Sequence, residues 1–123
     1  MFYEYQINRL IAEALGGAEG HTEYREDRPE GASRYIVGGA TEPLVIASES
    51  LFREPAGSRV KIREWAERQQ GEETIGFWLD EGLAYFDAGE SFYIREVALS
   101  AARKRGELAI WDRKESKEIR VEG

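Results

Sequence analysis

The stretch TIGFWLDEGLAYFDAGE, residues 74–90, predicts a β-hairpin around which the rest of the chain can be arranged. If Glu81-Gly82 forms a two-residue turn, the apolar side chains alternate along both arms and gather on one face. The facing pairs on that side are then Ile75 with Ala88, Phe77 with Phe86, and Leu79 with Ala84. A shift by one residue would place Ile75 opposite Asp87 and mix the two faces. The pattern therefore favours the first register and assigns its apolar face to the core.

The other face of this hairpin combines aromatic residues with carboxylates. It carries Gly76, Trp78, Asp80, Leu83, Tyr85 and Asp87. Two interpretations remain open: a helix covers this face and leaves only the aspartates in water, or the face is an amphipathic platform for a partner. Buried Trp and Tyr anchors dominate the energetics of many protein interfaces. In the second interpretation the partner-binding residues are Trp78, Asp80, Leu83, Tyr85 and Asp87.

Three segments show helical periodicity. The first is 2–15, which Gly16-Gly17 terminates. The second begins near Ser58, a good N-cap residue, and runs to Gly71. The third is 92–105, with basic residues in its last turn, where cations complement the helix dipole, and Gly106 after it. Its expected buried stripe consists of Ile94, Val97, Ala98, Ala101 and Ala102.

Short alternating apolar runs predict four further strands, at 34–39, 43–48, 108–112 and 118–121. Residues 16–33 lack any periodicity and are expected to form a long polar loop. The chain is thus predicted to be a single α+β domain over residues 1–123, in the order αββαββαββ, with a mainly antiparallel sheet and three helices mainly on one face. Phe77, Phe86, Val97 and Ile110 are expected to lie together in its core.

Composition sets limits on the class of protein. The 123 residues suffice for one domain with a core, and 41% apolar with 33% charged residues is typical of a folded, soluble chain. No apolar run approaches the roughly 18 residues of a membrane span, and the N-terminus lacks the pattern of a signal peptide. The absence of cysteine excludes disulfides and thiolate metal sites. We therefore expect a cytoplasmic protein with no membrane association.

The net charge indicates which partners are favoured. With 24 acidic and 17 basic residues the chain carries −7 at neutral pH. Nonspecific nucleic-acid binding needs clustered Lys and Arg, so direct nucleic-acid binding is not expected. A protein partner with a basic surface is compatible with this charge.

The sequence offers little catalytic or cofactor chemistry. His21, the sole histidine, lies among acidic residues, but no pattern supplies a nucleophile for it. Asp80, Asp87 and Glu90 match no calcium-loop spacing, and the glycine pairs match no phosphate-binding motif. We expect no catalytic residues, no metal site and no cofactor. A small hydrolase or ligand-binding enzyme that uses the carboxylates around the hairpin remains the alternative.

Residues 75–121 carry a resemblance, in the order GFWLDEGLAYFD, VALSAARKRGELAIWD and EIRV. They resemble a segment of small uncharacterised proteins encoded by bacteriophages and other mobile elements. The resemblance implies an inhibitor or decoy that binds a host defence complex in the host cytoplasm, as anti-CRISPR proteins do, and an accessory virion protein is a further alternative. The chain departs from acidic mimics of DNA, because −7 is modest and 17 basic residues interrupt any phosphate-like track.

Overall fold

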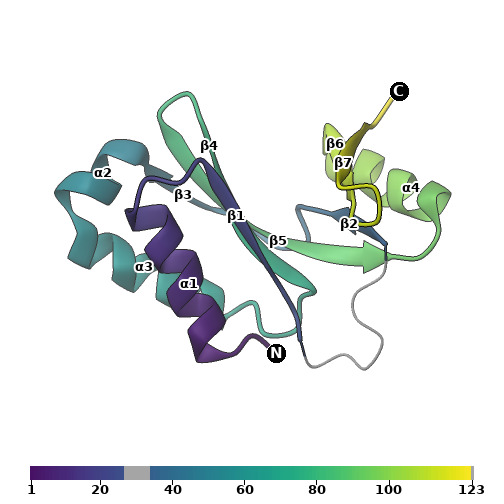
Figure 1. Cartoon of the computed structure of the whole chain (residues 1–123). Helices are drawn as coiled ribbons and strands as arrows, with labels where there is room; N and C mark the ends of the chain where they lie inside the picture. The colour runs from purple at the N-terminus through teal and green to yellow at the C-terminus, as the bar shows by residue number, and fades with distance from the viewer. Residues whose placement is uncertain (27–33, 123) are drawn as a thin grey trace.

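Strand β5 (Leu83–Phe92) joins the two halves of one sheet in the computed structural model, which describes residues 1–26 and 34–122 (Figure 1). Its first half lies between β4 (Thr74–Asp80) and β3 (Leu44–Ala47), and its second half pairs with β2 (Tyr35–Val37). The outer strands are β1 (Gly20–Tyr24), β6 (Ala109–Asp112) and β7 (Lys117–Arg120). Every pairing is antiparallel, and the strand order is β1-β4-β5-β2-β6-β7, with β3 beside β5.

The predicted hairpin and its register are confirmed. Ile75 lies opposite Ala88, Phe77 opposite Phe86 and Leu79 opposite Ala84. Glu81 and Gly82 both have positive φ, 47° and 80°, as a two-residue turn of type I′ requires. This turn matches the right-handed twist of the strands, so it supports the same register that the apolar alternation favours.

Within residues 1–26 and 34–122, four helices accompany the sheet, one more than predicted. They are α1 (Glu4–Leu15), α2 (Ser48–Arg53), α3 (Pro55–Glu67) and α4 (Arg95–Arg105). In Figure 1, α1, α2 and α3 gather around the first half of the sheet, whereas α4 stands at the opposite end of the molecule beside β2, β6 and β7. The α+β class and the mainly antiparallel sheet are as predicted. Within the described ranges, none of the helices is long and apolar enough to cross a membrane.

The helices all pack on the same face of the sheet. Along β5, Ala84, Phe86 and Ala88 belong to the core under α1, α2 and α3, and Phe92 packs into a second core under α4. Because side chains alternate along a strand, these even-numbered residues share one face. The odd-numbered residues of β5 therefore point to the other face, which we call the open face.

Strand β1 corrects the prediction that residues 16–33 form a loop. Glu23 in this strand is buried and accepts two hydrogen bonds from Arg9 of α1, at 2.6 and 2.5 Å. The strand is thus stabilised by an ion pair and by backbone pairing with β4 rather than by apolar alternation, which explains why the pattern did not reveal it. Residues 27–33 of the predicted loop lie outside the described residues.

The second predicted helix begins earlier and ends sooner than expected. Ser58 is not an N-cap, because α3 starts at Pro55, which suits a first helical position since it has no N–H to leave unpaired. The Ser58 hydroxyl is buried and donates instead to the carbonyl oxygen of Ser50 in α2. Ser58 therefore joins two consecutive helices, and α3 ends at Glu67 rather than at Gly71.

The prediction of one shared core was wrong. Phe77 and Phe86 lie in the larger core, but Ile110 lies in the second core with residues of α4. Val97 is 47% exposed. Helix α4 buries Ala98, Leu99 and Ala102, which confirms Ala98 and Ala102 of the predicted stripe. Ala101 packs partly buried against the second core, whereas Ile94 is 61% exposed. Phe92 belongs to β5, and the helix begins only at Arg95.

Candidate functional site

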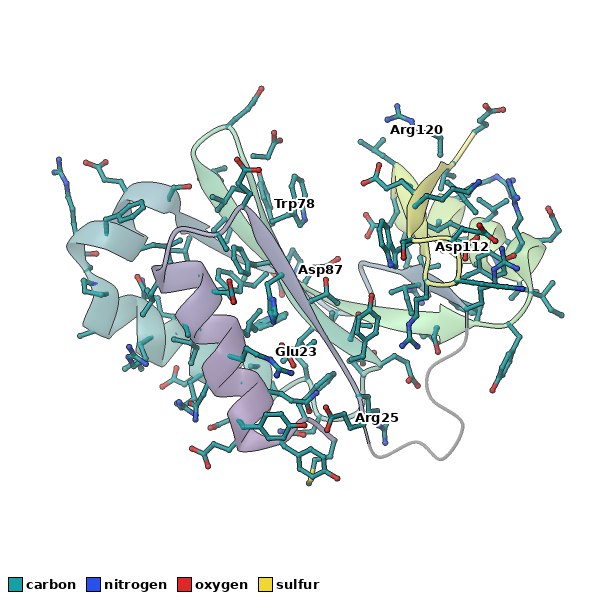
Figure 2. The ribbon with its side chains drawn as sticks, viewed as in Figure 1. Glu23, Arg25, Trp78, Asp87, Asp112 and Arg120 are labelled. Atoms are coloured by element: carbon teal, nitrogen blue, oxygen red, sulfur yellow. The ribbon has the colours of Figure 1, made fainter. Side chains whose placement is uncertain are left out.

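The open face carries an exposed aromatic pair in its first half. Trp78 of β4 lies directly opposite Tyr85 of β5, and their rings stack with centroids 4.6 Å apart and 18° between planes. Trp78 is 49% exposed, and Tyr85 is half-buried beneath it. Figure 2 shows the Trp78 side chain on the side of the sheet away from α1. None of the helices in the described part of the chain covers Trp78. The interpretation in which a helix covers this face therefore does not hold.

Strand β3 extends this pair into an apolar surface. Val45 pairs with Tyr85 and is 46% exposed, and Ala47 pairs with Leu83. Residues paired across an antiparallel ladder share a face, so Val45 lies beside the Trp78–Tyr85 pair. Sequence reasoning missed Val45, because its place depends on the register between β3 and β5, strands that are far apart in the chain. The apolar part of the open face thus consists of Trp78, Tyr85, Leu83 and Val45.

Exposed carboxylates lie at one end of this surface. Asp80 pairs with Leu83 at the end of the hairpin, and Glu81 occupies the turn itself. Both side chains are exposed. The hairpin tip therefore places two negative charges next to the aromatic pair, as the sequence predicted for Asp80.

Asp87 lies on the same face but has a different environment. Its carboxylate oxygens accept hydrogen bonds of 3.1 and 3.0 Å from the backbone N–H of Gly39. Glu107 lies close by, because a Cβ built on Gly38 would fall 2.3 Å from an oxygen of Asp87 and 2.6 Å from one of Glu107. Both carboxylates thus crowd Gly38, and a side chain at this position would have to displace them. Asp87 holds the segment that follows β2, and it lies partly buried rather than at an exposed rim.

Burial raises the pKa of both of these carboxyl groups. For Asp87, burial outweighs the hydrogen bond from Gly39 and the nearby charge of Arg105, both of which lower the pKa. For Glu107, burial and then the negative charge of Asp87 raise the pKa, against the effect of Arg105. Arg105 itself binds Glu90 and donates to the carbonyl oxygen of Gly38 at 3.2 Å. The two carboxyls are therefore shifted in the same direction, unlike an acid and a base whose pKa values are driven apart.

The second half of the open face carries another half-exposed tryptophan. Trp111 of β6 pairs with Ile36 of β2, which pairs in turn with Ser91 of β5, so Trp111 lies on the same face as Trp78. Glu118 of β7 pairs with Trp111. A cation–π contact is formed by residues of two outer strand segments: the guanidinium of Arg113, which follows β6, lies 4.2 Å from the ring centroid of Tyr24 at the end of β1. This contact links the β6–β7 turn to the opposite edge of the sheet.

His21 belongs to a cluster on the helix side of the sheet. Its Nε2 bonds to Glu23, which Arg9 also binds. Burial raises the pKa of Glu23, but the hydrogen bonds from Arg9 and His21 outweigh that effect and lower the pKa. This cluster fastens β1 to α1 and lies apart from the open face. Among residues 1–26 and 34–122, no group of three or more His, Cys, Asp or Glu side chains is arranged to hold a metal ion.

Comparison with family models, with curated proteins and with solved structures finds no match to this chain.

Proposed function

We propose that the protein is a non-catalytic binding module that uses the first half of its open face to bind a protein partner with a basic surface. The observation that carries this proposal is the exposed Trp78–Tyr85 stack. An aromatic pair flanked by Val45 and Leu83 offers a rigid apolar anchor, because each ring has few rotatable bonds to immobilise on binding.

The partner's charge follows from the carboxylates at the hairpin tip. Asp80 and Glu81 are exposed beside the apolar surface, and the net charge of −7 adds a negative field around the whole molecule. Such charges mainly raise the association rate and fix the orientation, whereas desolvated aromatics supply most of the affinity. A basic protein surface complements both features, and a nucleic-acid backbone would be repelled.

The geometry favours binding over catalysis. The carboxyls nearest to the aromatic pair are either exposed at the hairpin tip or, in Asp87, engaged by the backbone of Gly39. A hydrolase would need a carboxyl with a raised pKa near one with a lowered pKa, in a concave pocket. Asp87 and Glu107 both have raised pKa values instead.

The resemblance of residues 75–121 to proteins of phages and mobile elements supplies the biological setting of the proposal. In that setting the partner is a host antiviral complex of the CRISPR type, and the protein inhibits it by occupying a basic surface. The apolar part of the open face lies within the region that carries the resemblance, apart from Val45. An accessory role in the virion would use the same face, so the identity of the bound protein separates the two.

The test is binding by single variants of the open face. The wild-type protein is used to capture a partner from host lysate, and affinities of purified variants are then measured for that partner. Trp78→Ala should weaken binding by about 2 kcal/mol or more, because truncation of a central aromatic removes a hot spot. Asp80→Lys should chiefly slow association and reduce its dependence on salt.

The matched control is Phe52→Ala, which removes an exposed aromatic from α2 on the helix side. It should leave the affinity unchanged. Capture that is equally strong with Trp78→Ala would show that the open face is not the binding surface. For the inhibitory role, expression of the wild type in a cell with an active defence complex should restore phage infection, and Trp78→Ala should not.

A further inference from the structure

Helix α4 carries exposed apolar side chains on the side that faces away from the core. Its core side is formed by Ala98, Leu99 and Ala102. On its outer side, however, Ile94 at the N-cap is 61% exposed and Val97 is 47% exposed. A depression on this outer side is lined by Glu96, Val97, Ser100, Ala101, Lys104 and Arg105. The sequence pattern placed Ile94 and Val97 in the core, but both side chains are exposed, whereas Ala101 packs partly buried against the second core.

Two opposite charges on this outer side are equally spaced from Ser100, and the third charged residue of the depression, Arg105, is bound to Glu90. Glu96 lies four residues before Ser100 and Lys104 four residues after it, so the three residues form one ridge of the helix. Within the part of the chain that the structure describes, neither Glu96 nor Lys104 has an ion pair or a side-chain hydrogen bond. A surface with opposite charges at equal distances from its centre is complementary to itself when one copy is turned around.

We propose that α4 is the contact through which two copies of this chain form an antiparallel dimer. A twofold axis beside Ser100 brings Glu96 of each copy next to Lys104 of the other, which gives two equivalent ion pairs. Ser100 and Ala101 are small, so the helices approach closely at the crossing point. Val97 then packs in the depression of the second copy, beside its Ala101.

Exposed apolar residues also flank the two ends of the helix. Tyr93 lies before its first residue and Leu108 after its last, and both side chains are exposed. Antiparallel pairing therefore brings Tyr93 of one copy to the same end of the contact as Leu108 of the other. A helix of 11 residues is roughly 16 Å long and buries less than the roughly 800 Å² per partner of a standard interface. We therefore expect a reversible dimer with a dissociation constant in the range of about 10–100 µM.

This dimer leaves the open face free. Helix α4 packs on the face of the sheet opposite to Trp78, and it stands at the end of the molecule far from α1, α2 and α3 (Figure 1). The two aromatic surfaces of a dimer are thus both available, and a partner with repeated sites would be bound with increased avidity.

The experiment is sedimentation velocity of the full chain over a concentration series, with two charge reversals and their combination. The wild type should change from monomer to dimer as its concentration rises. Glu96→Lys and Lys104→Glu should each weaken association by at least about tenfold, because each variant places like charges opposite one another. The double variant Glu96→Lys/Lys104→Glu should recover the wild-type dissociation constant to within about threefold, because it restores both ion pairs in reversed sense.

Glu64→Lys, a reversal at an exposed site on α3, is the matched control and should not change the dissociation constant. Circular dichroism and the melting temperature of each variant show whether α4 is still folded. A wild type that stays monomeric up to about 1 mM, well above the expected range, would overturn the proposal. So would a dimer that resists both single reversals, or a double variant as weak as the single ones in a folded state. Dimerisation is measured without the partner, so its outcome is independent of the function proposed for Trp78.

Discussion

Phe77 lies directly opposite Phe86 in the β4–β5 ladder, and their rings stack with centroids 5.4 Å apart. Trp65 of α3 meets Phe86 edge-on at 6.1 Å. Phe86→Ala removes the ring that both neighbours contact and leaves a cavity. The free energy of unfolding should fall by about 3–5 kcal/mol, measured by chemical denaturation.

Trp78→Ala provides the comparison within the same hairpin, since Trp78 pairs with Tyr85 one step along the ladder but on the open face. A half-exposed ring contributes mainly its stacking, so the loss should be about 1 kcal/mol or less. Equal losses for Phe86→Ala and Trp78→Ala would contradict the assignment of the two faces.

Asp112 should make the protein sensitive to acid. Arg34 donates two hydrogen bonds to its carboxylate, at 2.8 and 2.7 Å, and these bonds lower the pKa of Asp112 to about 2. A lowered pKa stabilises the folded state above the unfolded pKa of about 3.9, and this contribution is lost as the pH falls toward 2. Asp112→Asn should therefore be less stable at pH 7 and should show a shallower loss of stability between about pH 4 and 2. Denaturation at several pH values measures this, with the exposed Asp80→Asn as a control of little effect.

Asp87 should have the opposite dependence. Burial raises the pKa of Asp87, so the neutral form is favoured in the folded state and stability is lost as the pH rises through the folded pKa. Asp87→Asn keeps an acceptor for the Gly39 N–H without the charge, and its stability relative to the wild type should increase from pH 4 to 7. Asp87→Ala lacks the acceptor and should be less stable at every pH. If Asp87→Asn resembled Asp87→Ala, the charge itself would be needed to hold Gly39.

Local signals made the β4–β5 hairpin predictable. Alternation from Ile75 to Ala88 and the Glu81-Gly82 turn act within neighbouring residues, so they define a register without knowledge of the rest of the fold. The same holds for the end of α4 at Gly106, which has the positive φ of 73° that a glycine adopts at this position.

The features that were missed depend on contacts between distant segments. Strand β1 contains Glu23, whose charged carboxylate is buried only because Arg9 forms an ion pair with it. The exposure of Val97 depends on which side of α4 meets β2 and β6. The place of Val45 on the open face depends on the pairing of β3 with β5. No window of the sequence contains these relationships.

Strand β2 also bears on how the chain folds. It has only three residues, yet it lies between β5 and β6 and is the connection through which β6 and β7 join the sheet. Its residues, Tyr35 to Val37, are all buried. They are made early in synthesis, whereas β5, α4 and β6, which cover them, come from the last third of the chain. During translation the apolar residues of β2 therefore remain unpaired until most of the protein has been synthesised. We expect the late formation of these long-range strand pairings to limit the folding rate.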